Sequence, residues 1–120
     1  MRPTEEAPTL DAARIDELSA MLGDDEALLA LFDAFFRDLT PRLDSMHEGL
    51  KARRAELIDS AAHAVRGASA NLGATAVCRL AGELEITARD EDFGPVGRLL
   101  ARLEAEICRL RHRLLNSGLR

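Results

Sequence analysis

Apolar residues recur every three or four positions along most of this chain, and this spacing restricts the fold to packed amphipathic helices. Two long stretches show the pattern most clearly. One stripe comprises Leu28, Phe32, Phe35, Leu39, Leu43, Met46 and Leu50. The last stretch is nearly a heptad, with Val96, Leu99, Leu100, Leu103, Ile107, Leu110 and Leu114. The apolar residues are mainly Leu and Ala, which favour helix over strand.

Capping residues predict where the first two helices begin and end. Asp11 is a good N-cap for a short first helix, and Gly23 is suited to end it. Asp24 then opens the second helix. Pro41 falls inside that helix, so we expect a kink or a break near Thr40.

Three further helices complete the expected fold. The spacing predicts a third helix over about residues 53–71, ended by Gly73, and a fourth over about residues 74–89. The loop "RDEDFGP" separates the fourth helix from the last one. Four long amphipathic segments with short connections predict an all-α fold, an antiparallel four-helix bundle, with the short first helix packed across one end.

The length of 120 residues fits a single domain. Residues 1–9 are expected to form a disordered lead, residues 10–116 the helical domain, and residues 117–120 a frayed C-terminus. The Met start and the basic end favour a free-standing protein.

Composition narrows the class of function. Residues 1–50 carry 4 Lys/Arg against 12 Asp/Glu, and the net charge of the chain is −5, which disfavours nucleic acid as a partner. Trp and Tyr are absent, so aromatic platforms for stacking bases are few. No run approaches the roughly 18 apolar residues of a membrane span. Cys78 and Cys108 lie within helical patterns and are interpreted as free thiols of a cytoplasmic protein.

The third predicted helix places a histidine on its outward face. Its inward residues leave His63, Arg66 and Gly67 on the opposite side, where spacings of three and four make them neighbours. A glycine inside a helix costs roughly 1 kcal/mol relative to alanine, so Gly67 requires a reason. An exposed imidazole that accepts a phosphoryl group, an arginine that offsets the new charge and a bare glycine that clears the approach together supply one.

The stretch "HAVRGASANLGA" resembles the signature of histidine-containing phosphotransfer (HPt) domains. That signature reads His-x-x-Lys-Gly, then a small or hydroxyl residue, then Leu-Gly-Ala. The matching residues are His63, Gly67, Ser69, Leu72, Gly73 and Ala74. Arg66 stands where the family usually has Lys; it keeps the charge but alters reach and geometry. The segments "LDAARIDELSAMLGDDEALLALFDAFFRDL" and "CRLAGELE" resemble the family's first two helices and its fourth.

The resemblance implies a phosphocarrier that relays a phosphoryl group between receiver-domain aspartates through His63, supported by Arg66, Gly67 and Ser69. The implied partners are receiver domains of response regulators or of a hybrid sensor kinase, with Mg²⁺ on the receiver and no cofactor on this chain. The sequence contains no P-loop and no other glycine-rich nucleotide loop, so we expect no ATP site and no enzyme in the usual sense. A monomer is expected.

A partner that reaches His63 must also cover the protein surface around this residue. We expect the apolar part of this docking face to include Ile15, Leu18 and Met21 of the first helix, beside the small residues Ala64 and Ala70. By the same resemblance, Glu85 and Arg89 of the fourth helix are candidates for a polar rim.

Other interpretations remain open at this stage. The main alternative is an HPt-like helical adaptor that binds a receiver or dimerises without phosphotransfer, whereas no nucleophile–base motif supports a hydrolase. His47 is expected to be exposed and without a partner. Cys108 and His112, four residues apart, form at most half of a metal site, so we predict no bound metal.

Overall fold

The computed structural model describes residues 8–116, which form five α-helices. They are α1 (Ala12–Leu22), α2 (Asp25–Ala52), α3 (Ala55–Leu72), α4 (Thr75–Arg89) and α5 (Phe93–Leu115). No strand occurs within residues 8–116, so the predicted all-helical class is confirmed. The predicted lead lies largely outside the described residues, and the predicted frayed C-terminus lies entirely outside them.

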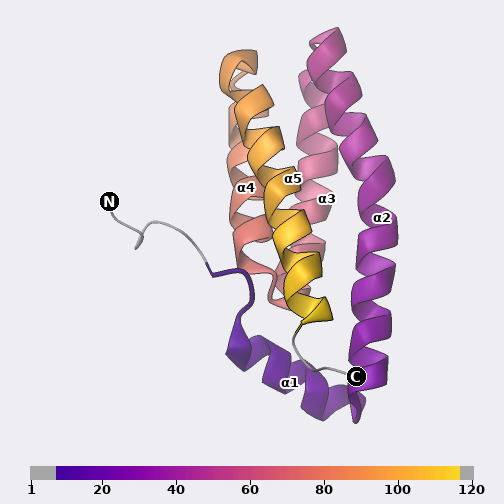
Figure 1. Ribbon diagram of the computed structural model, residues 1–120. Helices are drawn as coiled ribbons and strands as arrows, with labels where there is room; N and C mark the ends of the chain where they lie inside the picture. Colours follow the sequence, from indigo (N-terminus) through magenta and orange to yellow (C-terminus); the bar gives the residue numbers. More distant parts are fainter. Residues whose placement is uncertain (1–7, 117–120) are drawn as a thin grey trace.

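The four long helices run side by side, and α1 lies across their lower end in Figure 1. α3 packs most extensively against α4, while α2 contacts α3, α4 contacts α5, and α5 returns to α2. The residues between these helices are almost entirely Leu, Ile, Val, Ala, Phe and Met. The largest fully buried side chains include Phe32, Leu28, Met46, Ile58, Leu84, Leu100, Leu103 and Leu110.

The predicted caps form as expected. The Asp11 carboxylate accepts from the Ala13 amide at 3.1 Å, and the Asp24 carboxylate accepts from the Ala27 amide at 2.7 Å. α1 and α3 end at Gly23 and Gly73, whose φ angles of +89° and +73° are left-handed. Side chains resist that conformation, so glycine is the residue that allows these two sharp stops.

α2 runs for 28 residues without interruption, so of the predicted kink or break near Thr40 the break is wrong. Pro41 lacks an amide hydrogen and leaves the Arg37 carbonyl without its usual helical donor. Both residues are exposed, so water can supply the missing hydrogen bond. The buried Leu39 and Met46 on either side hold the two halves of α2 to the same core.

The start of α1 is fixed to the turn between α3 and α4. The Asp11 amide donates to the Gly73 carbonyl at 2.8 Å, and the Arg14 Nε donates to the Asn71 carbonyl at 2.8 Å. A side chain on Gly73 would press on Arg14, since an added Cβ would lie 3.0 Å from the Arg14 Cβ. These contacts place α1 at the end of α3 that follows His63 in sequence.

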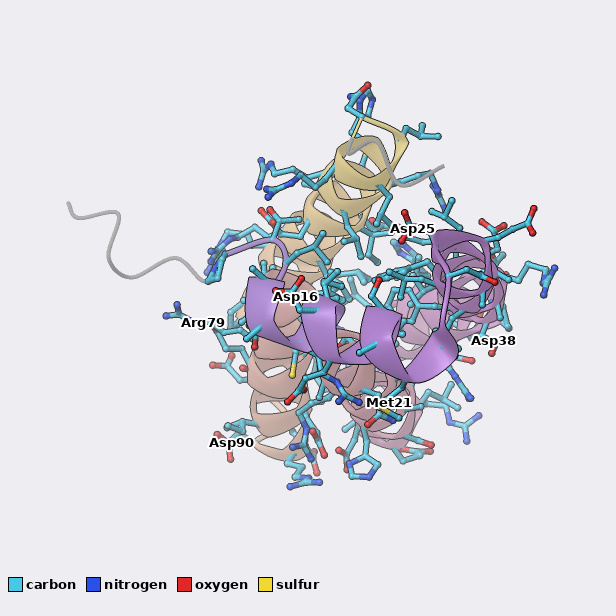
Figure 2. All side chains as sticks on the ribbon, turned by 90° about the horizontal axis from the view of Figure 1, so that it is seen from below. Asp16, Met21, Asp25, Asp38, Arg79 and Asp90 are labelled. Carbon is cyan, nitrogen blue, oxygen red and sulfur yellow. The ribbon has the colours of Figure 1, made fainter. Side chains whose placement is uncertain are left out.

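The apolar residues of α1 divide between the core and the surface. Leu18 is buried and Ile15 is half-buried against the core, whereas Met21 is 74% exposed along the lower edge of α1 in Figure 2. The prediction of Leu18 as a docking residue is therefore wrong, because the long helices already cover its side chain. Ile15 is likewise turned mainly to the core.

Candidate functional site

His63 projects from the outer face of α3 toward the neighbouring helix α4. Its side chain is 65% exposed, while Ala62 and Val65 of the same helix are buried. The ring Nδ1 lies 2.8 Å from the Oε2 of Glu85 on α4. The predicted outward position of His63 is confirmed, and the partner of its Nδ1 is a residue from another helix.

The contact with Glu85 determines which ring nitrogen carries the proton. A carboxylate accepts hydrogen bonds and does not donate them, so a 2.8 Å contact requires Nδ1 to be protonated. Neutral imidazole then keeps its lone pair on Nε2. Nε2 has no hydrogen-bond partner within residues 8–116. In the neutral ring, Nε2 is therefore the nucleophilic nitrogen that the site presents at the surface.

Arg66, one turn after His63, is held by the same carboxylate. Its Nε donates to Glu85 Oε1 at 2.6 Å, and its side chain is 45% exposed. Its Nη2 lies 3.3 Å from His63 Nδ1. We interpret this approach as a van der Waals contact and not as a hydrogen bond, because a protonated Nδ1 has no lone pair to accept one. The Nη groups of Arg66 thus remain beside the imidazole with donors to offer.

Arg89, on α4, is the second arginine that contacts Glu85. Its Nη2 donates to Glu85 Oε2 at 2.8 Å, and its Nε lies 3.1 and 3.2 Å from the two carboxylate oxygens of Asp59. Asp59 stands one turn before His63 on α3. The hydrogen bond to Asp59 raises the pKa of Arg89 above its ordinary value. Two carboxylates and two guanidinium groups thus alternate across the α3–α4 contact and cancel in charge.

Glu85 is hydrogen-bonded to three members of this cluster, His63, Arg66 and Arg89. Only 4% of its side chain is exposed, although both of its oxygens carry hydrogen bonds. Burial raises the pKa of Glu85, but the hydrogen bonds and charges of Arg66 and His63 outweigh that effect, so its pKa lies below the ordinary value. Glu85 therefore stays ionised at neutral pH beneath the imidazole.

The prediction of Glu85 as part of an exposed rim is wrong. Its register carried the signal: position 85 follows Ala81 by four and precedes Ala88 by three, which places it on the buried side of α4. Arg89, predicted for the same rim, is 58% exposed. Of this pair, four residues apart on α4, Glu85 is therefore buried and Arg89 lies at the surface.

The residues beside His63 have small side chains, so they do not obstruct access to the imidazole. Gly67 is exposed, and an added Cβ would meet nothing within 4 Å outside its own helix. Ala70 is exposed and Ala64 is half-buried. Ser69 is fully buried and donates to the Val65 carbonyl at 2.6 Å, so its hydroxyl supports the backbone of α3 and not the site itself.

The remaining candidates lie away from this cluster. His47 is exposed, but it has a partner, because its Nε2 lies 2.9 Å from Glu104 Oε2; the expectation of none is wrong. Cys78 and Cys108 are free thiols. In residues 8–116 no group of three or more His, Cys, Asp or Glu is arranged to hold a metal, and Cys108 and His112 gain no further ligand. None of the helices described is long and apolar enough to cross a membrane.

Comparison with known proteins identifies the class. The sequence model of the Hpt domain matches residues 30–113. The crystal structure of histidine-containing phosphotransfer protein B (HptB) from Pseudomonas aeruginosa PAO1 is similar, with a TM-score of 0.80 and 32% sequence identity. The similarity covers 88% of this chain and 90% of that one. No curated protein matches the sequence.

Proteins of the Hpt class are phosphocarriers. The chain belongs to the histidine-containing phosphotransfer (Hpt) family. Its function is histidine phosphotransfer in a phosphorelay.

The depressed pKa of Glu85 makes the stability of the protein depend on pH. A carboxyl group that titrates lower in the folded chain stabilises the fold above its unfolded pKa, near 4.5, and loses that contribution as the pH falls through the folded pKa. We expect Glu85→Gln to lower the free energy of unfolding at pH 7 by on the order of 1 kcal/mol, since the arginine partners are half exposed. Urea titrations from pH 7 to pH 3 measure this.

The matched control is Glu104→Gln, which removes a carboxylate paired with an exposed histidine on α2. The difference in stability between wild type and Glu85→Gln should shrink as the pH falls below about 4.5, whereas Glu104→Gln should differ little from wild type throughout. A Glu85→Gln variant with the wild-type pH profile would contradict the assigned ionisation.

Proposed function

We propose that His63 Nε2 is the phosphoryl acceptor, and that it takes the group from the aspartate of one receiver domain and passes it to that of another. The observation that carries this proposal is the Glu85 contact, which occupies Nδ1 and leaves Nε2 open. The exposure of the ring allows a receiver to reach it.

In the transfer step, the Nε2 lone pair forms a bond to phosphorus while the bond between phosphorus and the aspartyl oxygen breaks. The electron pair of that bond returns to the aspartate, which becomes a carboxylate again. The imidazole retains its proton on Nδ1 and gains a positive charge. Glu85 lies 2.8 Å from Nδ1 and stabilises that charge through a charge-assisted hydrogen bond. The reverse step regenerates the neutral ring.

Arg66 is suited to bind the incoming phosphoryl oxygens. Its Nε is engaged by Glu85, which holds the planar guanidinium beside the imidazole. The Nη groups keep donors for an anion that binds beside the ring, since Nη2 lies 3.3 Å from His63 Nδ1. Arginine can therefore remain anchored by one edge while the other contacts the phosphoryl group. Ser69 contributes indirectly, through its hydrogen bond to the α3 backbone.

The partners in this proposal are receiver domains of response regulators or of a hybrid sensor kinase. Mg²⁺ is assigned to the receiver, where it supplies charge neutralisation, and this chain contributes neither a cofactor nor an ATP site. We take the protein to act as a cytoplasmic monomer. We take residues 10–116 to be the functional domain, with α2–α5 as an antiparallel four-helix bundle and α1 packed across one end, an arrangement that the view in Figure 1 supports.

The docking face proposed here is smaller than the sequence alone suggested. Met21 of α1 is strongly exposed and remains a candidate contact, together with Ala64, Ala70 and Arg89. Leu18 and Glu85 are excluded as direct contacts, because their side chains are buried.

Transfer of phosphate, as opposed to binding alone, is tested by removing the acceptor. We expect His63→Ala to abolish phosphorylation both by a phosphorylated receiver and by phosphoramidate, with the helical circular dichroism unchanged because the ring lies outside the core. The measurement is acid-labile, alkali-stable phosphate on the purified chain.

His47→Ala is the matched control, since it removes another exposed histidine that also contacts a glutamate. It should accept phosphate as wild type does. Phosphate that persists on His63→Ala would contradict the assignment of His63, whereas a wild-type chain that binds a receiver but gains no phosphate would favour the adaptor.

Gly67 is expected to provide access for the receiver. Gly67→Gln adds a helix-forming side chain into open space, so it should raise the free energy of unfolding by up to about 1 kcal/mol. The same side chain stands one turn after His63 and should slow transfer from a receiver by at least tenfold. Stopped-flow or radiolabel transfer assays and urea denaturation measure the two effects.

Gly67→Ala distinguishes the effect of a large side chain from the effect of losing the glycine. It should gain most of the stability and keep most of the transfer rate. Normal transfer by Gly67→Gln would show that the glycine does not clear the approach.

A further inference from the structure

A shallow hollow of about 270 Å³ lies beside the His63 cluster on α4. Its lining residues are Arg66, Gly82, Glu85, Ile86 and Arg89. Three of them are the direct hydrogen-bonding partners within the cluster, so the hollow continues the surface around His63. Gly82 adds no side chain to the hollow, and an added Cβ there would be in ordinary contact with the Arg66 side chain, at 3.4 Å.

Ile86 is the feature of this hollow that the transfer chemistry does not use. Its side chain is 62% exposed, although a neighbouring position on α4, Glu85, is buried. The other large apolar side chains exposed within residues 8–116 lie on α1, α2 and α5: Met21, Leu22, Leu31 and Leu115. Around His63, the uncharged residues that α3 contributes to the surface are small: Ala64, Gly67 and Ala70. Ile86 is therefore the one large apolar contact that this surface offers a partner.

We infer that Ile86 is an apolar anchor for the receiver domain. When the receiver docks on His63, the interface buries Ile86 together with the hollow that it lines. This inference rests on the proposed function and names a specificity-determining contact on α4.

The size of an interface supports this placement. A standard interface covers about 800 Å² on each partner, which corresponds to a disc of about 16 Å radius. Ile86 directly follows Glu85, whose carboxylate touches the His63 ring, so it falls well inside such a disc centred on His63. A receiver that brings its aspartate to Nε2 must therefore cover Ile86.

Charge complementarity favours a receiver as the occupant over a second copy of this chain. The side chains of Arg66 and Arg89 are 45% and 58% exposed at the walls of the hollow, whereas Glu85, which they share, is 4% exposed and Asp59, the second partner of Arg89, is 31% exposed and does not line the hollow. The charges of the cluster balance in sum, but its arginines are the more exposed members, so the hollow presents cationic edges around an apolar side chain. Those edges are complementary in charge to a phosphorylated aspartate, which is itself an anion. A second copy would instead bring the same arginines together.

Three neutral substitutions test the anchor without altering the charge of the site. Ile86→Ser removes the apolar side chain, Ile86→Leu keeps it, and Leu115→Ser removes a leucine of similar exposure, 60%, from α5. The probe is the receiver domain of the source organism that transfers phosphate to the wild-type chain fastest. Isothermal titration gives the Kd, and transfer assays give kcat and KM.

We expect Ile86→Ser to raise the receiver Kd and the KM for transfer by about tenfold, with Ile86→Leu and Leu115→Ser within about twofold of wild type. Labelling by phosphoramidate should be unchanged in all three, because a small donor needs no docking surface. These results together would support the anchor.

Other outcomes overturn it. An unchanged Kd for Ile86→Ser, an equal loss in Leu115→Ser, or a loss of phosphoramidate labelling in Ile86→Ser would each do so. If the wild-type chain accepts phosphate from no receiver, the proposed function fails and the inference fails with it. Normal wild-type transfer with an unaffected Ile86→Ser overturns the inference alone.

Discussion

The buried carboxylate of Glu85 is the interaction on which the rest of this site depends. An ionised group that is only 4% exposed is costly unless it is paired, and Glu85 is paired three times, by His63, Arg66 and Arg89. The donors come from two helices, so the same contacts that compensate the charge fix α3 against α4. Fold and chemistry therefore share one set of hydrogen bonds.

This arrangement explains how a surface histidine acts without a pocket. The imidazole is exposed to a partner, while the buried carboxylate of Glu85 fixes its tautomer and orientation. Helices α3 and α4 make the most extensive contact in the bundle, so His63 stands on a rigid base. The surrounding small residues leave the imidazole accessible, and in the proposed function the chemistry that activates the phosphoryl group belongs to the partner.

The sequence predicted what depends on local pattern and missed what depends on how helices meet. The caps at Asp11 and Asp24 and the stops at Gly23 and Gly73 follow from local backbone chemistry and were predicted correctly. The outward register of His63 follows from the period of α3. The exposure of Leu18 depends on the angle at which α1 crosses the bundle, which periodicity does not encode. The role of Glu85 requires knowing that its position on α4 faces the outer side of α3, and the pairing of His47 likewise requires knowing that α2 lies beside α5.

The central claim is that Glu85 holds the proton on Nδ1 of His63 and leaves Nε2 as the nucleophile. Long-range ¹H–¹⁵N correlation spectra of the ¹⁵N-histidine-labelled protein test this directly, with His63→Ala identifying the resonances. We expect His63 to show a protonated Nδ1 and an unprotonated Nε2 at neutral pH, a loss of that preference in Glu85→Gln, and phosphorus bonded to Nε2 after treatment with phosphoramidate. A proton on Nε2 in the unmodified wild-type protein, or phosphorus on Nδ1, would contradict the claim.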